Sequence, residues 1–265
     1  MAIEYKHLPG MEILSCTDPF EFKPHIHDRY VVWINTGCGE HFSIKGNTDI
    51  LQPGSISIIE PGLVHANHPC SETRRHLRSF YIDPDFFSDL SEGGGDKTGF
   101  GYERKTVKDK SLWRKMACLH QQIISGTDIC MLESNVIDTF MSLVTRHGKN
   151  ACKTSNHDTC DIRVRKAVEY FRAHLDQEVL LKDLAEKLGC TQYHLIRLFK
   201  THKGMSPHAF LRQMRLEHAR RRLEQGCRIS HAAHEAGFSD QSHLTRAFKS
   251  RFGLTPSVYQ ATICD

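Results

Sequence analysis

The chain has 265 residues, of which 39% are apolar and 25% are charged, and its formal net charge is +4. This composition is typical of a folded chain with room for one large or two ordinary domains, and it excludes a disordered or fibrous protein. No run approaches the roughly 20 apolar residues of a membrane span. The N-terminal MAIEYKHLPG also lacks the apolar core of a signal peptide. We therefore expect a cytoplasmic protein without membrane contact, whose ten cysteines are reduced.

Charge is distributed unevenly along the chain. Residues 161–265 hold 18 basic and 11 acidic side chains, a net charge of +7, whereas the remaining 160 residues hold 17 and 20, a net charge of −3. A basic C-terminal third indicates a polyanionic partner for that part of the chain.

The first 85 residues have the pattern of short strands separated by turns. Segments 31–37, 40–46, 55–60 and 77–83 are rich in β-branched and aromatic residues. Glycine- and proline-containing turn signals such as Gly46-Asn47 and Pro53-Gly54 lie between them. The pattern predicts a small β-barrel or sandwich.

Two helices are expected after a glycine-rich loop at 91–101. They cover residues 111–124 and 131–147, and the second has apolar residues at helical spacing. It is expected to pack on the barrel and can also form a dimer seam. The polar segment 149–161 reads as a linker. We therefore divide the chain into residues 1–148, a linker at 149–161, and residues 162–265.

An internal repeat lies in the C-terminal part. HLIRLFKTHKGMSPHAF begins at His194 and HLTRAFKSRFGLTPSVY begins at His243, an offset of 49 residues. Such a duplication indicates one supersecondary unit used twice.

Each copy has the features of a helix-turn-helix unit. In the first, Gly189 ends a short helix in a left-handed conformation and Thr191 caps the next helix. In the second, Gly237 and Asp240 (or Ser239) have these roles. A long helix at 206–226 connects the units, and if it is rigid both second helices can enter successive major grooves, about 34 Å apart.

The second helix of each unit is the candidate DNA-reading element. Polar side chains near its N-terminal half can reach base edges, whereas Lys200, Lys249 and Arg251 lie further along and are expected to meet phosphates. The exposed positions expected to bind DNA are Gln192, Tyr193, Ile196, Arg197, Lys200, Gln241, Ser242, Thr245, Arg246 and Lys249. Ile196 is apolar and is therefore a poor base reader.

The segment GFSDQSHLTRAFKSRFGLTPSVY resembles the C-terminal signature of AraC/XylS-family transcription regulators, and LKDLAEKLGCTQYHLIRLFKTHKGMSPHAFLRQMRLEHARRRL resembles the first unit of that family. The resemblance implies an all-α DNA-binding domain that recognises promoter half-sites in double-stranded DNA and acts on RNA polymerase recruitment. The expected fold class is therefore α+β, with an N-terminal cupin-like β-barrel and a C-terminal all-α domain carrying both units. A homodimer without enzymatic activity is the expected state.

The N-terminal part resembles the cupin-type sensor domain of such regulators through PHIHDRYVVWINTGCGEHFSIKG, LQPGSISIIEPGLVH and LRSFYIDP. We expect a small organic effector inside the barrel. The candidate effector-binding residues are His25, His27, Arg29, Trp33, Glu60, His65 and Asn67.

His25, His27 and His65 leave a second interpretation open. Two histidines in the pattern His-x-His with a distant third are how cupin enzymes hold a metal, and neutral imidazole is a good ligand for first-row metals. The alternatives are therefore a divalent metal sensor or a metal-dependent cupin enzyme fused to a DNA-binding tail. No cofactor is certain from the sequence.

Overall fold

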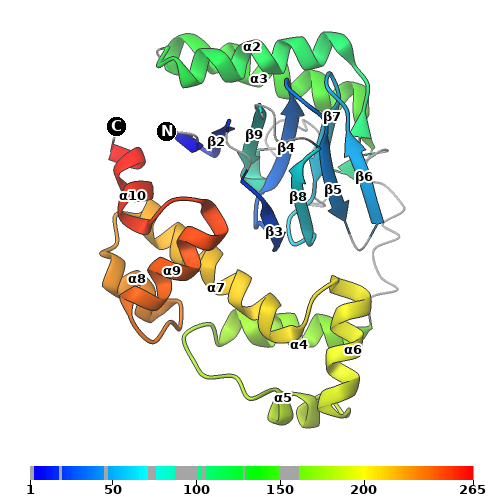
Figure 1. Ribbon diagram of the computed structural model, residues 1–265, viewed down its shortest axis with the longest axis vertical. Helices are drawn as coiled ribbons and strands as arrows, with labels where there is room; N and C mark the ends of the chain where they lie inside the picture. The colour runs from blue at the N-terminus through cyan, green and yellow to red at the C-terminus, as the bar shows by residue number, and fades with distance from the viewer. Residues whose placement is uncertain are drawn as a thin grey trace.

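The computed structural model describes residues 3–17, 20–44, 47–70, 76–86, 101–102, 106–127, 129–149 and 161–264. Strands and two helices form an N-terminal part, here called the β domain, and helices alone form a C-terminal part, here called the helical domain (Figure 1). Most of the loop expected at 91–101 and of the linker expected at 149–161 lies outside the described residues.

The larger sheet of the β domain has six antiparallel strands. In spatial order they are β1 (Ile3–Leu8), β2 (Met11–Cys16), β9 (Leu77–Ile82), β4 (Tyr30–Asn35), β7 (Ile56–Ile59) and β11 (Thr106–Val107). The strands expected at 31–37, 55–60 and 77–83 are found here as β4, β7 and β9. The N-terminal pair β1 and β2 was not delimited from the sequence.

A four-stranded antiparallel sheet forms a second layer. Its order is β3 (Phe22–His25), β8 (His65–Pro69), β5 (Glu40–Ile44) and β6 (Asn47–Leu51), and a small separate pair joins β10 (Gly101–Tyr102) to β12 (Gly148–Lys149). No hydrogen-bonded ladder among the described strands joins the two larger sheets. The cupin-like domain is thus a two-sheet sandwich and not a closed cylinder.

Strand β4 shows why the β domain has a third layer. Side chains alternate between the two faces of a strand, so Val31 and Trp33 point into the sandwich while Val32 and Ile34 point outward. The outward face is covered by helices α2 (Lys110–Ile124) and α3 (Ile129–His147) (Figure 1). Both helices were expected within one or two residues of these bounds, the second from its apolar spacing.

The helical domain contains both predicted helix-turn-helix units. The first follows α4 (Ile162–Ala173) and consists of α5 (Leu181–Lys187) and α6 (Gln192–Lys203); the second consists of α8 (Ile229–Glu235) and α9 (Gln241–Phe252). Helix α7 (Pro207–Glu224) connects the units, and α10 (Pro256–Cys264) follows the second. In Figure 1, α6 and α9 lie toward opposite ends of α7.

Local signals place the ends of α6 and α9 as expected. The side chains of Thr191 and Asp240 accept hydrogen bonds from the backbone N–H groups of His194 and His243, at 3.2 and 2.7 Å. Gly189 and Gly237 end the preceding helices with φ of 66° and 71°.

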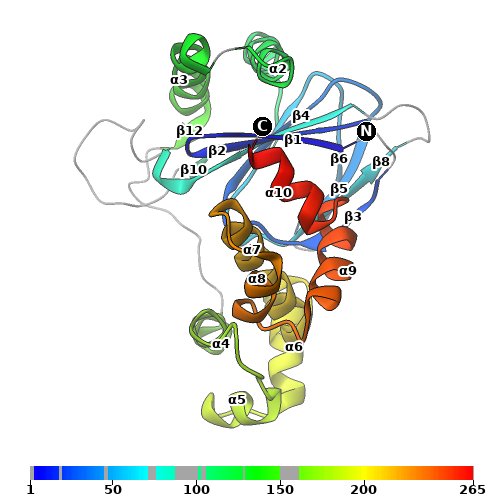
Figure 2. The ribbon, with the colours of Figure 1, turned by 90° about the vertical axis from the view of Figure 1, so that its left-hand side faces the viewer.

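The β domain packs against both helix-turn-helix units. Ile26 and Val64 belong to the apolar cluster of the first unit, which includes Phe171 and Phe199. The sandwich interior around Trp33 is continuous with the apolar cluster of the second unit. Figure 2 shows α10 alongside β1 and β2. Among the helices of the described residues, none is both long and apolar enough to cross a membrane.

Candidate DNA-binding helices and regulatory site

Helix α6 presents most of its predicted DNA-reading side chains to solvent. Gln192, Tyr193, Arg197 and Lys200 are exposed, and Tyr193 retains 78% of its accessible surface. Ile196 is partly buried and packs on the apolar cluster of the first unit. An apolar side chain with packing partners has a structural role that does not require DNA.

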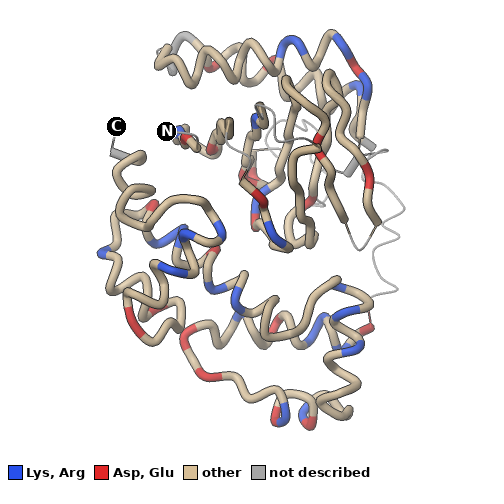
Figure 3. The backbone as a smooth tube through the Cα atoms, viewed as in Figure 1, with Lys and Arg blue, Asp and Glu red and all other residues tan. Residues whose placement is uncertain are grey.

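Helix α9 repeats this arrangement. Gln241, Ser242, Arg246 and Lys249 are exposed, while Thr245 is half-buried and donates its hydroxyl proton to the Gln241 carbonyl at 2.8 Å. Arg246 and Lys249 thus occupy positions equivalent to Arg197 and Lys200 at the 49-residue offset. Basic residues recur throughout the helical domain (Figure 3).

Arg251 does not fit the expectation that it meets phosphate. It retains only 7% exposure and points from the C-terminal end of α9 into the β domain. Its Nη2 donates to the Ile26 carbonyl at 3.2 Å, and it lies 3.1 Å from His27 Nε2 and 3.4 Å from Glu217 Oε1. A guanidinium enclosed in this way cannot reach DNA. The prediction that Arg251 contacts phosphate is therefore wrong for this structure.

The three candidate histidines of the β domain lie together. His25 and His65 are directly opposite each other on β3 and β8, and one ring nitrogen from each of His25, His27 and His65 lies within 4.8 Å of the others. All three side chains are buried. Burial lowers the pKa of His65 to about 4, and burial with the nearby Arg251 holds the pKa values of His25 and His27 well below their usual range. The cluster is therefore neutral at pH 7.

The cavity beside these histidines is small. It measures about 10 Å³ and is also lined by Trp33 and Asn67. About 10–15 Å³ is the minimum for a single water molecule, so this conformation has room for one atom-sized species and not for an organic molecule. The remaining two candidates, Arg29 and Glu60, are not among the described residues that line it.

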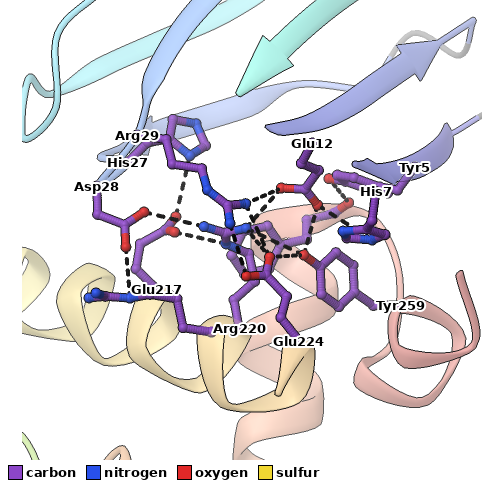
Figure 4. A network of polar contacts seen from close by, with 12 residues as sticks. Tyr5, His7, Glu12, His27, Asp28, Arg29, Glu217, Arg220, Glu224 and Tyr259 are labelled. Atoms are coloured by element: carbon purple, nitrogen blue, oxygen red, sulfur yellow. Dashed lines mark hydrogen bonds and ion pairs between the residues drawn. The ribbon is translucent and has the colours of Figure 1, made fainter. Parts of the chain in front are cut away.

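Arg29 instead belongs to a buried ionic network between the domains (Figure 4). It donates to Glu12 at 3.2 Å, to Asp83 at 2.6 Å and to Glu224 at 3.1 Å. Glu12 is on β2 and Glu224 is on α7, so Arg29 connects the β domain to the helix that separates the DNA-reading units.

Arg220 of α7 is the centre of the same network. It is 2% exposed and lies 2.8 Å from Glu12, 2.9 Å from Glu217 and 3.2 Å from Asp28. Burial raises the pKa of the Glu12 carboxyl to about 7, although Arg220 opposes this shift. The Tyr259 hydroxyl also belongs to this network, because it lies 2.7 Å from both Glu12 and Glu224.

A larger cleft opens next to this network. It measures about 490 Å³, and both domains line it. The β domain contributes residues 26–28 and 61–62, and the helical domain contributes Val168, Arg172, Leu175, Phe210, Met214, Glu217, His218 and Arg221. This volume lies within the range of small-molecule sites.

Sequence reasoning missed Glu12, Glu217, Arg220 and Glu224 as functional candidates. Arg220 and Glu12 are 208 residues apart in the chain, and no local pattern records such a pairing. A signal was nevertheless present in helix 206–226, where Glu217 and Arg220 lie close in sequence to the buried Leu216, Ala219 and Leu223.

Known proteins share both halves of this architecture. Residues 9–136 match the family described as AraC-like ligand binding domain, and residues 184–262 match a helix-turn-helix domain family. The raffinose operon transcriptional regulatory protein RafR of Pediococcus pentosaceus is 31% identical over 94% of this chain and 91% of its own length. The uncharacterized HTH-type transcriptional regulator YbfI of Bacillus subtilis is 28% identical over 84% of this chain and 82% of its own length.

These matches define the class of protein. The chain belongs to the AraC/XylS family of transcription regulators, with a ligand-binding domain and a helix-turn-helix DNA-binding domain. The fold agrees: ToxT from Vibrio cholerae, crystallised with an unsaturated fatty acid, superposes with a TM-score of 0.59 at 14% identity, over 95% of this chain and 94% of its own.

Proposed function

We propose that this regulator reads promoter DNA with the exposed faces of α6 and α9, and that an effector controls it through the contact between its two domains. The observation that carries this is the equivalence of Arg197 and Lys200 with Arg246 and Lys249, exposed on two helices whose units both pack on the β domain. Regulation follows because any ligand that changes the packing of the β domain changes the setting of both units.

The 490 Å³ cleft is the proposed site of an organic effector. Apolar side chains such as Phe210 and Met214 line the cleft and can pack against an apolar part of a ligand. Arg172 and Arg221 supply charged hydrogen-bond donors. A ligand there touches both domains and so favours one arrangement of them over another. The relatives support a small-molecule effector, since ToxT was crystallised with a fatty acid and RafR is named for a raffinose operon.

The proposed partners are double-stranded DNA, RNA polymerase and a second copy of the chain, acting in the cytoplasm without catalytic activity. For the homodimer, support comes from α3, where Ile137 and Met141 retain 44% and 36% exposure one turn apart. The variant Ile137→Lys should sediment as a monomer at concentrations where the wild type is dimeric. Wild-type sedimentation as a monomer, with and without DNA, would overturn this part.

Arg246 provides the test of DNA reading. On a duplex enriched from a random library by the wild-type protein, Arg246→Ala should lose about 1–3 kcal/mol of discrimination at one base pair. Arg246→Lys is the matched control for charge, because lysine keeps the attraction to phosphate but lacks the bidentate fork. It should retain affinity for unrelated DNA while losing the same discrimination.

The salt dependence of binding separates the two kinds of contact. Lys249→Ala should weaken binding to all sequences alike and reduce the salt slope by about one. Unchanged specificity in Arg246→Ala would mean that α9 does not read bases.

A further inference from the structure

The histidine cluster has the features of a metal site and few features of an organic binding site. In His65, Nδ1 lies 3.0 Å from the Leu63 carbonyl oxygen, and in His25, Nδ1 lies within hydrogen-bond distance of the Lys23 carbonyl oxygen. A carbonyl oxygen only accepts, so both Nδ1 atoms carry the ring proton. The lone pair of each neutral ring is then on Nε2. A ring held by a carbonyl in this way is the usual second contact of a metal-bound histidine.

The dimensions agree with a single ion. Zinc binds histidine nitrogen at about 2.0–2.1 Å in a tetrahedral site, which places ligand nitrogens about 3.3 Å apart. One ring nitrogen from each histidine lies within 4.8 Å of the others, so the three rings have to close by at most about 1.5 Å to reach that spacing. The adjoining cavity of about 10 Å³ leaves room for one further water-sized ligand and none for a substrate.

We propose that His25, His27 and His65 bind one divalent first-row transition ion, such as Zn²⁺, and that this binding displaces Arg251 of α9 from the β domain. Metal binding does not depend on the function proposed above, whereas its effect on regulation rests on the proposed DNA binding.

Arg251 is displaced because it and a metal require the same group. A neutral imidazole has one nitrogen lone pair, and the Nη2 atom of Arg251, which only donates, lies 3.1 and 3.3 Å from the two ring nitrogens of His27. Coordination by His27 removes that acceptor and brings a second positive charge next to the guanidinium.

Once His27 no longer accepts a hydrogen bond from Arg251, Glu217 is the nearby carboxylate that still binds the guanidinium. Glu217 of α7 is the carboxylate that faces both His27 and Arg251, at 3.4 Å from each. It is also bound by Arg220 at 2.9 Å, so Glu217 is shared. Because Arg251 is part of the second DNA-reading helix, the metal acts directly on the element that carries Arg246.

The first experiment measures zinc binding to the full-length protein by calorimetry, with Co²⁺ absorption to report nitrogen coordination. We expect one tightly bound ion per chain, lost in His65→Gln and in His25→Gln. His68→Gln is the matched control, because His68 lies on the same strand as His65 but is exposed. Circular dichroism establishes that each variant is folded. Equal binding by wild type and both cluster variants, or no binding at all, would overturn the site.

The second experiment tests the displacement. Removal of the guanidinium in Arg251→Gln should tighten zinc binding by about tenfold or more, as expected for linked sites. Zinc should also speed amide hydrogen exchange at the C-terminal end of α9 in the wild type and not in His65→Gln. An unchanged zinc affinity in Arg251→Gln would overturn the displacement.

These outcomes are independent of DNA binding. Specific DNA binding by a protein that does not bind zinc would refute the metal site alone. Tight zinc binding by a protein without specific DNA binding would refute the proposed function and leave the metal site standing.

Discussion

Arg251 occupies the place in the second helix-turn-helix unit that His202 has in the first, 49 residues earlier. The two copies match at the exposed Arg197 and Arg246 but differ here, and only Arg251 is buried against the β domain. The side chains that we propose to contact DNA are thus repeated, whereas Arg251, which contacts the β domain, is not. Through Arg251, the second unit makes a buried polar contact with the β domain from a position where the first unit has a partly buried histidine.

His120 in α2 makes the stability of the protein sensitive to acid. It is 1% exposed, its Nε2 lies 2.9 Å from the Leu14 carbonyl, and burial lowers its pKa to about 4 from 6.5. Between pH 6.5 and 4 the unfolded chain therefore binds more protons at this site than the folded chain, so stability falls as the pH falls through this window.

The variant His120→Gln tests this assignment. We expect His120 to contribute about 2 kcal/mol to the loss of unfolding free energy between pH 7.5 and 5, and His120→Gln to lose that much less than the wild type. Urea denaturation at the two pH values measures the difference. Parallel losses in both proteins would show that His120 does not titrate in this way.

Arg220 shows what a buried charge contributes at the domain interface. Removal of its guanidinium leaves Glu12 and Glu217 buried without their main counter-charge, which typically costs about 3–5 kcal/mol. We expect Arg220→Met to lower the unfolding free energy by this amount.

Arg222, two residues further along α7, is the matched control. Its pair with Glu235 is half-exposed, and exposed ion pairs contribute little. Arg222→Met should therefore unfold at the same denaturant concentration as the wild type. An equal effect of the two substitutions would contradict the structural role of the network.

The helices of the helical domain follow from signals that lie within a few residues of one another. Thr191, Asp240 and Gly189 mark helix ends, and apolar spacing marks the buried faces. The exposure of the candidate DNA-reading residues could therefore be predicted from the sequence, except at Ile196 and Thr245, whose partial burial depends on tertiary packing.

The β domain was less predictable because its strands pair over long distances. The pattern of 31–37 and 77–83 was clear, but β2 pairs with β9, more than 60 residues away, and contains the buried Glu12 that a strand pattern does not explain. The cluster of His25, His27 and His65 was recognisable from residue type. The pairing of Arg29 with Glu224 was not recognisable from the sequence, since Glu224 lies in the other domain.

The N-cap of α6 is a feature whose energetic contribution can be measured. Thr191→Ala removes the acceptor of the His194 N–H and should lower the unfolding free energy by about 1 kcal/mol. Thr191→Ser keeps the hydroxyl and should behave nearly as the wild type in urea denaturation. A serine variant as unstable as the alanine variant would assign the effect to the lost methyl group instead of the cap.

At the scale of the whole molecule, the β domain acts as a common support for both DNA-reading units. It contacts the first through Ile26 and Val64. It contacts the second at Gly253, where an added Cβ would lie 2.3 Å from the Ile3 side chain. The network around Arg220 holds α7 between these two points (Figure 4). Contacts with one domain therefore constrain the relative position of the two units.

The apolar cluster shared by the sandwich and the second unit has a thermodynamic consequence. Separation of the domains would transfer side chains such as Tyr5, Phe252 and Tyr259 from a dry interior to water. Exposure of apolar surface raises the heat capacity. The free energy of separating the two domains should accordingly curve with temperature, as the free energy of unfolding a domain does.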